Sequence, residues 1–238
     1  MQLRFWNFTS ETEGRRILHI EGDIAAYSWW GDEVTPQEFK KELFSAAGDI
    51  DVIINSNGGD VFAANEIYGM LKEYPGNVRV KIAPLAASAA SVIAMAGDEV
   101  LISPVGMIFI HDPMASVFGN ETELGGAIES LKAVKENIVT AYEKKTGLPR
   151  DEIAQLMAAE TFIPATTAIK MGFADALLYE DDPKEATAFN RKEPVRITNA
   201  ATRAMLDKIK ATQEPPPAAN SIPAEPLYQR LDLIQKTL

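Results

Sequence analysis

Residues 84–91 of the chain, Pro84-Leu85-Ala86-Ala87-Ser88-Ala89-Ala90-Ser91, join a strand-like run to an apolar, helix-like run. The strand-like run covers 78–83, and the helix-like run continues to Ala96. A serine at such a junction lies beside unpaired main-chain N–H groups and the positive end of a helix dipole, which stabilise negative charge. The stretch therefore predicts one of two things: a site that holds an acyl oxyanion at Ser88, or a turn whose small residues serve only tight packing.

The alternation of strand-like and helix-like runs continues on both sides of this junction. Strands are predicted at 15–20, 51–55, 78–83, 99–102, 106–110 and 173–179, helices at 36–47, 61–71, 88–96, 121–145, 150–158 and 165–171, and a break at 161–164. Strands that alternate with helices pair in parallel, which predicts a layered α/β fold. The functional crevice of such a fold lies past the carboxyl ends of the strands, where 57–59, Ser88 and His111 are expected to meet.

The helix at 121–145 is the longest one predicted. Its apolar residues recur at steps of three and four, at Leu124, Ile128, Leu131, Val134, Ile138 and Tyr142. A stripe of this length packs on the helix's own domain or on a second subunit, and the pattern leaves both alternatives open.

The composition is that of an acidic globular protein without cysteine. Of the 238 residues, 46% are hydrophobic, and a formal net charge of −11 argues against a nucleic-acid-binding surface. Without cysteine the chain has no disulfides, thiol catalysis or cysteine metal sites. The N-terminus does not resemble a secretory signal, and the longest nearly apolar run, 82–96, is too short to span a bilayer. We expect a soluble, cytoplasmic protein with no nucleic-acid or membrane partner.

The character of the chain changes after Glu180. Residues 1–180 contain every predicted strand and are expected to form one folded domain. Residues 181–238 are polar and include Pro215-Pro216-Pro217, a composition that cannot bury enough surface to fold alone. We interpret 181–238 as a proline-rich C-terminal extension that is partly disordered.

Of the two histidines, His111 is the candidate for catalysis, whereas His19 lies inside a predicted strand and is interpreted as structural. His111 directly follows the strand at 106–110, so its imidazole is expected at the strand edge, where it can act as a general base for Ser88. Serine needs such a base because its hydroxyl does not ionise at neutral pH. Ser91 lies one helical turn deeper than Ser88 and is expected to face the packing.

The glycine pair Gly58-Gly59 follows another predicted strand. Two adjacent glycines allow positive φ angles and a close approach of main chains. The N–H groups of Gly59 and Ala89 are therefore candidates for a two-donor oxyanion hole, although most glycine pairs are only turns.

Four segments together resemble the Clp protease proteolytic subunit family, ClpP. Ile54-Asn55-Ser56-Asn57-Gly58-Gly59 resembles its Ile-Asn-Ser-Pro-Gly-Gly segment, and Ala86-Ala87-Ser88-Ala89 resembles its Ala-Ala-Ser-Met segment. Ile110-His111-Asp112-Pro113 resembles Ile-His-Gln-Pro, and the residues from Ala168 to Asp175 resemble the closing Ala-x-x-x-Gly-x-x-Asp segment. The resemblance keeps the order and spacing of these segments from Arg16 to Leu178.

The resemblance implies an α/β fold of the ClpP/crotonase type, with repeated β-β-α units and a long handle helix at 121–145. It implies a serine endopeptidase that works through an acyl-enzyme and needs neither a metal nor an organic cofactor. Ser88 is then the nucleophile, His111 the base and Glu160 the third triad member. The oxyanion donors are Gly59 and Ala89, and the implied substrate-binding residues are Gly58, Asp60, Met114, Ala115 and Ser116.

Asp112 is the alternative to Glu160 as the third member, because it adjoins His111. Adjacent residues of an extended chain point to opposite faces, so the Asp112 side chain is expected to aim away from the far ring nitrogen. Glu160 lies where the family has its aspartate, and it is one methylene longer.

The resemblance also implies partners. These are polypeptide substrates and copies of the chain itself in homo-oligomeric rings, either heptamers or stacked rings. Asn57 stands in place of the family's proline and Pro84 in place of its glycine. These departures and the proline-rich tail resemble phage-encoded ClpP-type head maturation proteases, for which capsid or scaffold proteins are the partners. An unfoldase ATPase is the partner expected for Clp-type degradation.

Two other functions fit the same fold. A crotonase-type acyl-CoA enzyme shares the oxyanion hole but needs no serine nucleophile. A catalytically inactive ring-forming assembly protein would retain the triad without using it.

Overall fold

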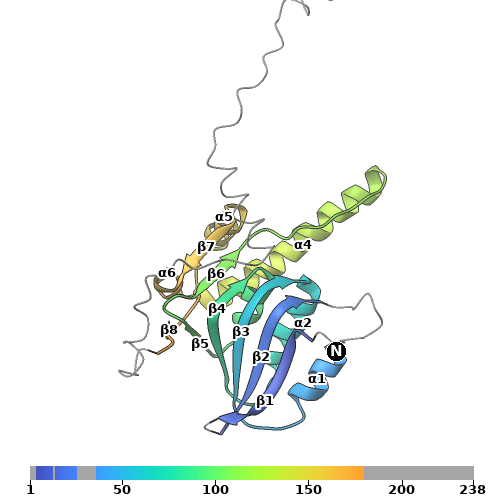
Figure 1. Ribbon diagram of the computed structural model, residues 1–238. Coiled ribbons are helices and arrows are strands. Elements are labelled where there is room, and N and C mark those ends of the chain that lie inside the picture. Colours follow the sequence, from blue (N-terminus) through green and yellow to red (C-terminus); the bar gives the residue numbers. More distant parts are fainter. Residues whose placement is uncertain (1–3, 13, 26–35, 180–238) are drawn as a thin grey trace, which may run out of the picture. The chain divides into compact units, whose positions relative to one another are not determined.

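The structure is a computed structural model that describes residues 4–12, 14–25 and 36–179. Within these residues eight strands form one sheet, in which β1 to β5 and then β8 lie side by side (Figure 1). The bounds are β1 Trp6–Thr12, β2 Arg15–Ile24, β3 Ile50–Gly59, β4 Val78–Ala87, β5 Glu99–Ile102, β6 Met107–Ile110, β7 Thr161–Pro164 and β8 Ala176–Leu177. The residues after 179, including the predicted extension, lie outside the described residues.

Most of the strand pairs are parallel, as the alternation of strands and helices predicts. β2 pairs with β3, β3 with β4, β4 with both β5 and β6, and β5 with β8 in parallel. The pairs β1–β2 and β6–β7 are antiparallel. The predicted α/β class is thus confirmed, but the sequence interpretation missed β1 and wrongly treated 161–164 as a break. Both are edge strands, each with a single antiparallel partner in the sheet.

The helices agree closely with the predicted ranges. They are α1 Pro36–Leu43, α2 Val61–Lys72, α3 Ala89–Ala94, α4 Glu121–Thr146, α5 Arg150–Ala158 and α6 Ala165–Lys170. The prediction carried the first helix to Ala47, but α1 ends at Leu43. There the Arg16 guanidinium binds the carbonyl oxygens of Glu42 at 2.8 Å and Leu43 at 2.7 Å, which satisfies the free acceptors at the helix end. The last predicted strand also shrinks, from 173–179 to β8.

The core lies between the helices and one face of the sheet. Along β3 and β4 the side chains alternate, and Val52, Ile54, Val80 and Ile82 have no exposed area. Helix α3 packs on β3 and β4 and contacts α2. This burial fixes which residues of each strand face the helices, because a one-residue slip would turn the whole apolar set outward.

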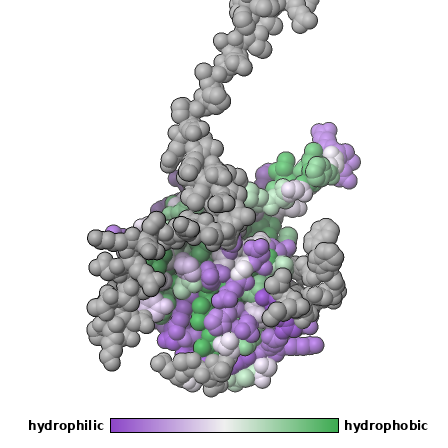
Figure 2. Space-filling view, in the orientation of Figure 1, coloured by the Kyte–Doolittle hydropathy of each residue, from purple (hydrophilic) through white to green (hydrophobic). Residues whose placement is uncertain are grey.

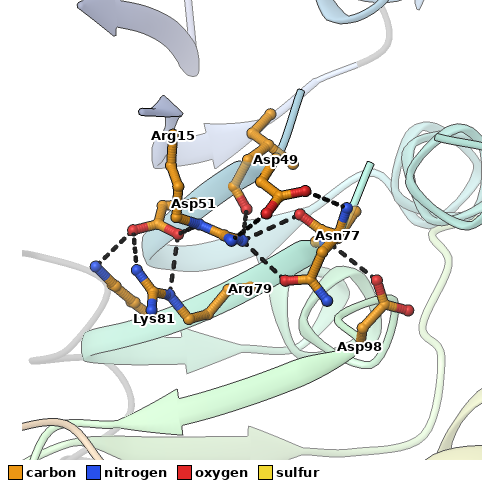
Figure 3. A network of polar contacts seen from close by, with 9 residues as sticks. Arg15, Asp49, Asp51, Asn77, Arg79, Lys81 and Asp98 are labelled. Carbon is orange, nitrogen blue, oxygen red and sulfur yellow. Dashed lines mark hydrogen bonds and ion pairs between the residues drawn. The ribbon is translucent and has the colours of Figure 1, made fainter. Parts of the chain in front are cut away.

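The opposite face of the sheet carries a buried charge cluster on three neighbouring strands (Figure 3). Asp51 of β3 is only 6% exposed, and it contacts Arg15 Nε at 2.6 Å, Arg79 Nη2 at 2.8 Å and Lys81 Nζ at 2.6 Å. Burial alone would raise the pKa of Asp51, but the hydrogen bonds from these cations outweigh it and lower the pKa to about 2. The cluster thus ties β2, β3 and β4 together in one register.

The two halves of α4 have different surroundings. Val134, Ile138 and Tyr142 in the second half are buried, whereas Leu124 and Ile128 in the first half are 42% and 53% exposed. The first half extends beyond the sheet and carries apolar side chains on its surface (Figures 1 and 2). The apolar stripe therefore serves the helix's own domain only in its second half. No helix in the described ranges is long and apolar enough to cross a membrane.

Asp51→Asn should destabilise the protein by about 3 kcal/mol at neutral pH, because three cations lose a shared, buried counter-charge. The lowered pKa sets the acid response of the wild type. Ionised Asp51 contributes its full share to the free energy of unfolding above its ordinary pKa of 3.8. That share is lost as the pH falls toward about 2. Urea unfolding measured at several pH values between 3.8 and about 2 should show a midpoint that falls with pH in the wild type and changes less in the variant. Equal midpoints for both proteins at pH 7 would contradict a stabilising role.

Candidate active site

Three adjacent strands end at the same edge of the sheet and bring the predicted site residues together. β3 ends at Gly59, β4 ends next to Ser88, and β6 ends next to His111. Because β4 pairs in parallel with both β3 and β6, these three strand ends are neighbours. The expected convergence at the carboxyl edge is therefore present in the fold.

Ser88 occupies a strained main-chain conformation between β4 and α3. Its φ is 53° and its ψ is −125°, a region that non-glycine residues rarely adopt and that costs about 1–3 kcal/mol. Its N–H donates to the Phe109 carbonyl oxygen of β6 at 2.8 Å. The strand that carries His111 thus also holds the turn that presents Ser88.

His111 lies within hydrogen-bond distance of Ser88 and has a defined tautomer. Its Nε2 is 2.7 Å from Ser88 Oγ, and its Nδ1 is 2.6 Å from the main-chain oxygen of Asp112. A carbonyl oxygen can only accept, so Nδ1 carries the proton of the neutral ring and Nε2 accepts from the serine hydroxyl. This tautomer is the one that can remove a proton from Ser88.

The Asp112 carboxylate faces α4 and not the ring of His111. Lys135 Nζ on α4 lies 2.7 Å from Asp112 Oδ1 and 2.9 Å from Oδ2. The side chain thus points away from His111, as the alternation along an extended chain predicts. The sequence reasoning missed the role of the Asp112 carbonyl, because no side-chain pattern signals a main-chain acceptor.

Glu160 directly precedes β7, just as His111 directly follows β6. In the antiparallel pair of β6 and β7, Ile110 is opposite Thr161, so His111 and Glu160 flank this last pair just outside the two strands. Glu160 has a φ of 49°, and its side chain is exposed. Within the described residues its carboxylate makes no hydrogen bond or ion pair. The structure therefore brings Glu160 near His111 without placing its carboxylate on the ring.

Gly58 packs directly against the Ser88 turn, whereas Gly59 packs against Ile24 of β2. A Cβ on Gly58, whose φ is 94°, would lie 2.6 Å from both Ala87 O and Ser88 Cβ and 2.9 Å from Ala89 N. Only glycine can occupy this position without moving the turn. The main chain of Gly58 is also fixed from within β3, because its N–H donates to Ser56 Oγ at 3.1 Å. The pair is the end of β3 and not the separate turn that the sequence suggested.

The other predicted substrate-binding residues have simpler surroundings. Asp60 caps α2, because its carboxylate accepts from the Ala63 N–H at 2.8 Å. Met114, Ala115 and Ser116 follow His111 in an irregular segment, and Met114 is 71% exposed. These three residues thus form an open strip beside the serine–histidine pair.

Ser91 faces the packing, as predicted, and also contacts a residue that the sequence reasoning did not assign to the site. Its Oγ lies 2.6 Å from the Ser88 carbonyl oxygen and 2.7 Å from the Tyr142 hydroxyl. Burial raises the pKa of Tyr142 well above its ordinary value. A tyrosine within an otherwise aliphatic stripe is the signal that could have indicated this contact.

Comparisons with known proteins match most of this chain to one family. The family model described as Clp protease matches residues 15–181. The ATP-dependent Clp protease proteolytic subunit of Deinococcus radiodurans is 29% identical over 132 residues, which cover 55% of this chain and 65% of that relative. The protein of the same name from Porphyromonas gingivalis is 27% identical over 165 residues, which cover 68% of this chain and 73% of that relative. The chain thus spans slightly less than two thirds of the first relative's length.

Proposed function

The chain belongs to the Clp protease family, and we propose that it is a ClpP-like serine endopeptidase that hydrolyses peptide bonds through an acyl-enzyme on Ser88. The observation that carries the proposal is the 2.7 Å contact between Ser88 Oγ and His111 Nε2. It is supported by the Nδ1 contact with Asp112 O, because that contact leaves Nε2 free to accept a proton.

In the proposed mechanism Ser88 Oγ attacks the scissile carbonyl carbon while His111 Nε2 takes the hydroxyl proton. The tetrahedral oxyanion accepts hydrogen bonds from the N–H groups of Gly59 and Ala89. The C–N bond then breaks, and His111 gives its proton to the leaving amine. Water attacks the resulting ester, transfers a proton to His111 and displaces Ser88, which recovers its proton.

Substrate is proposed to lie as an extended chain along the open strip of Met114, Ala115 and Ser116. Gly58 is proposed to contact the main chain of the substrate on the other side of the site. Asp60 is proposed to support this side of the substrate site indirectly, by capping helix α2. An extended substrate suits such a site because its alternate side chains leave the main chain free to pair.

The biological setting is either capsid or scaffold processing in phage head maturation or Clp-type protein degradation. We favour head maturation on the departures at Asn57 and Pro84 and the proline-rich tail. Neighbouring portal and capsid genes would support this choice, whereas a neighbouring unfoldase gene would overturn it. A crotonase-type acyl-CoA enzyme is the weaker alternative, because that chemistry has no use for the contact between serine and histidine.

Ser88→Ala should lower peptide hydrolysis by about four to six orders of magnitude and abolish labelling by a fluorophosphonate probe, because the nucleophile is lost. Ser45→Ala, at an exposed position two residues past the end of α1, is the matched control and should retain both hydrolysis and labelling. Mass spectrometry of the labelled wild type should find the adduct on Ser88. An adduct on Ser91, or hydrolysis that persists in Ser88→Ala, would contradict the proposal.

Glu160 is proposed as the carboxylate that supports His111 during catalysis. The register of β6 and β7, and a Glu160 carboxylate that makes no hydrogen bond or ion pair within the described residues, support this role. The carboxylate is proposed to replace the Asp112 carbonyl on Nδ1 once the ring is protonated. A carboxylate stabilises an imidazolium more strongly than a neutral carbonyl does.

Glu160→Gln should therefore lower kcat by at least about 100-fold with little change in thermal stability, because the charge that stabilises the imidazolium is lost. Asp112→Asn should be much milder, since the Asp112 side chain contacts Lys135 and its main-chain carbonyl is retained. Steady-state rates of the two variants decide the assignment. The reverse ranking would give the role to Asp112, and a wild-type rate in Glu160→Gln would leave the main-chain carbonyl as the sole support.

Assembly into homo-oligomeric rings is the quaternary state that we propose. The exposed apolar side chains of Leu124 and Ile128 support it, because a second copy could cover them. Ile138 lies on the same stripe but is buried in its own domain, so a substitution there would test folding and not assembly.

Leu124→Asp combined with Ile128→Asp should lower the mass measured by light scattering, because each charge would be buried at the contact. Thr122→Asp combined with Ser130→Asp places the same two charges on other exposed positions of this half of α4 and should leave the mass unchanged. An unchanged mass in both variants would exclude this helix as an assembly contact.

A further inference from the structure

Two buried hydroxyl groups connect α4 to the main chain of Ser88. Ser91 is fully buried and Tyr142 is 1% exposed, so neither hydroxyl can exchange its protein partner for water. Ser91 Oγ lies 2.6 Å from the Ser88 carbonyl oxygen and 2.7 Å from the Tyr142 hydroxyl oxygen. Buried polar groups of this kind are costly unless they are paired, and these two pair with each other.

The direction of both hydrogen bonds follows from the chemistry of the groups. The Ser88 carbonyl can only accept, so the single hydroxyl proton of Ser91 goes to it. The Tyr142 hydroxyl must then donate to Ser91 Oγ. Burial raises the pKa of Tyr142, so its hydroxyl keeps this proton throughout the neutral pH range. The result is a one-way chain from Tyr142 through Ser91 to the Ser88 carbonyl, which we call the hydroxyl chain.

The hydroxyl chain holds the peptide group between Ser88 and Ala89. That peptide group is planar, so a fixed Ser88 carbonyl also fixes the direction of the Ala89 N–H. The same carbonyl accepts from the Ser91 N–H at 2.9 Å, and the Ser88 N–H is held by Phe109 O at 2.8 Å. A residue with a φ of 53° and a ψ of −125° needs such support on both sides, because its conformation is not a favoured one.

Helix α4 is the rigid frame for this chain. The Tyr142 ring is held against Phe173 at 5.6 Å between ring centroids. About two turns earlier, Lys135 binds the carboxylate of Asp112, whose main-chain oxygen contacts His111. The same helix therefore supports the turn that presents the nucleophile and the segment that presents the base.

From these contacts we infer that Ser91 and Tyr142 are positioning residues, which fix the Ser88–Ala89 peptide group so that the Ala89 N–H points toward the oxyanion. This inference rests on the proposed peptidase function and adds to it a role for two residues that touch neither substrate nor reacting atoms. Such residues act on the transition state, in which the oxyanion develops, more than on the binding of substrate.

The test compares Ser91→Ala, Tyr142→Phe and the double variant, with stability and kinetics measured on each. Ser91→Ala leaves the Tyr142 hydroxyl buried without a partner, so it should be the least stable of the three. The double variant removes both hydroxyls and should recover much of that stability. Its kcat should nevertheless stay about tenfold below that of the wild type with KM unchanged, a smaller loss than removal of a whole oxyanion donor.

Tyr74→Phe is the matched control, because it removes the hydroxyl of another buried tyrosine, whose one hydrogen bond within the described residues is to Ala46 O at 3.4 Å, remote from the site. It should keep the wild-type kcat. Recovery of kcat together with stability in the double variant would overturn the positioning role, and so would a wild-type kcat in all three variants. Tyr142→Phe keeps the ring, so it gives a folded protein to measure even where Ser91→Ala does not.

The two proposals fail in different ways. A wild type whose hydrolysis does not depend on Ser88 overturns the proposed function and the positioning role with it. If wild-type hydrolysis depends on Ser88 but kcat merely follows stability across Ser91→Ala, Tyr142→Phe and the double variant, the positioning role alone is overturned.

Discussion

The proposed chemistry depends most on the strained main chain of Ser88, with its φ of 53° and ψ of −125°. In a regular strand or helix, the side chain of a serine points sideways from the element and not out of its end. The strain persists because the surroundings hold the residue on every side: Phe109 O binds its N–H, Ser91 binds its carbonyl, and Gly58 packs against its Cβ. Stability elsewhere in the fold therefore maintains one costly turn.

The sheet supplies that stability through its register. β3, β4 and β6 end beside one another only if their pairing is fixed, and the Asp51 cluster and the fully buried residues of β3 and β4 fix it from opposite faces. The site thus depends on contacts far from it along the chain. Helix α4 adds a second frame, because its buried half reaches the turn of Ser88 through Tyr142 and the segment of His111 through Lys135.

The sequence predicted the features that follow from local periodicity and failed where tertiary contacts decide. Helix α5 was placed at its observed bounds, and the convergence of Ser88, His111 and the glycine pair followed from parallel pairing alone. β7 was missed, because its four residues end in Pro164, which argues against a strand, and only the pairing with β6 defines them as one. The partner of His111 Nδ1 was also missed, since a main-chain carbonyl has no sequence signature. Tyr142 was counted as part of an apolar stripe because periodicity reports burial and not hydrogen bonding.

The central claim is that the Ser88 turn presents both a nucleophile and an oxyanion donor. The most direct measurement is a crystal structure of the protein after reaction with a peptidyl phosphonate inhibitor, whose adduct resembles the tetrahedral intermediate. The account predicts phosphorus bonded to Ser88 Oγ and the phosphoryl oxygen within hydrogen-bond distance of the N–H groups of Gly59 and Ala89. An adduct on another residue, or a phosphoryl oxygen directed away from both N–H groups, would contradict it.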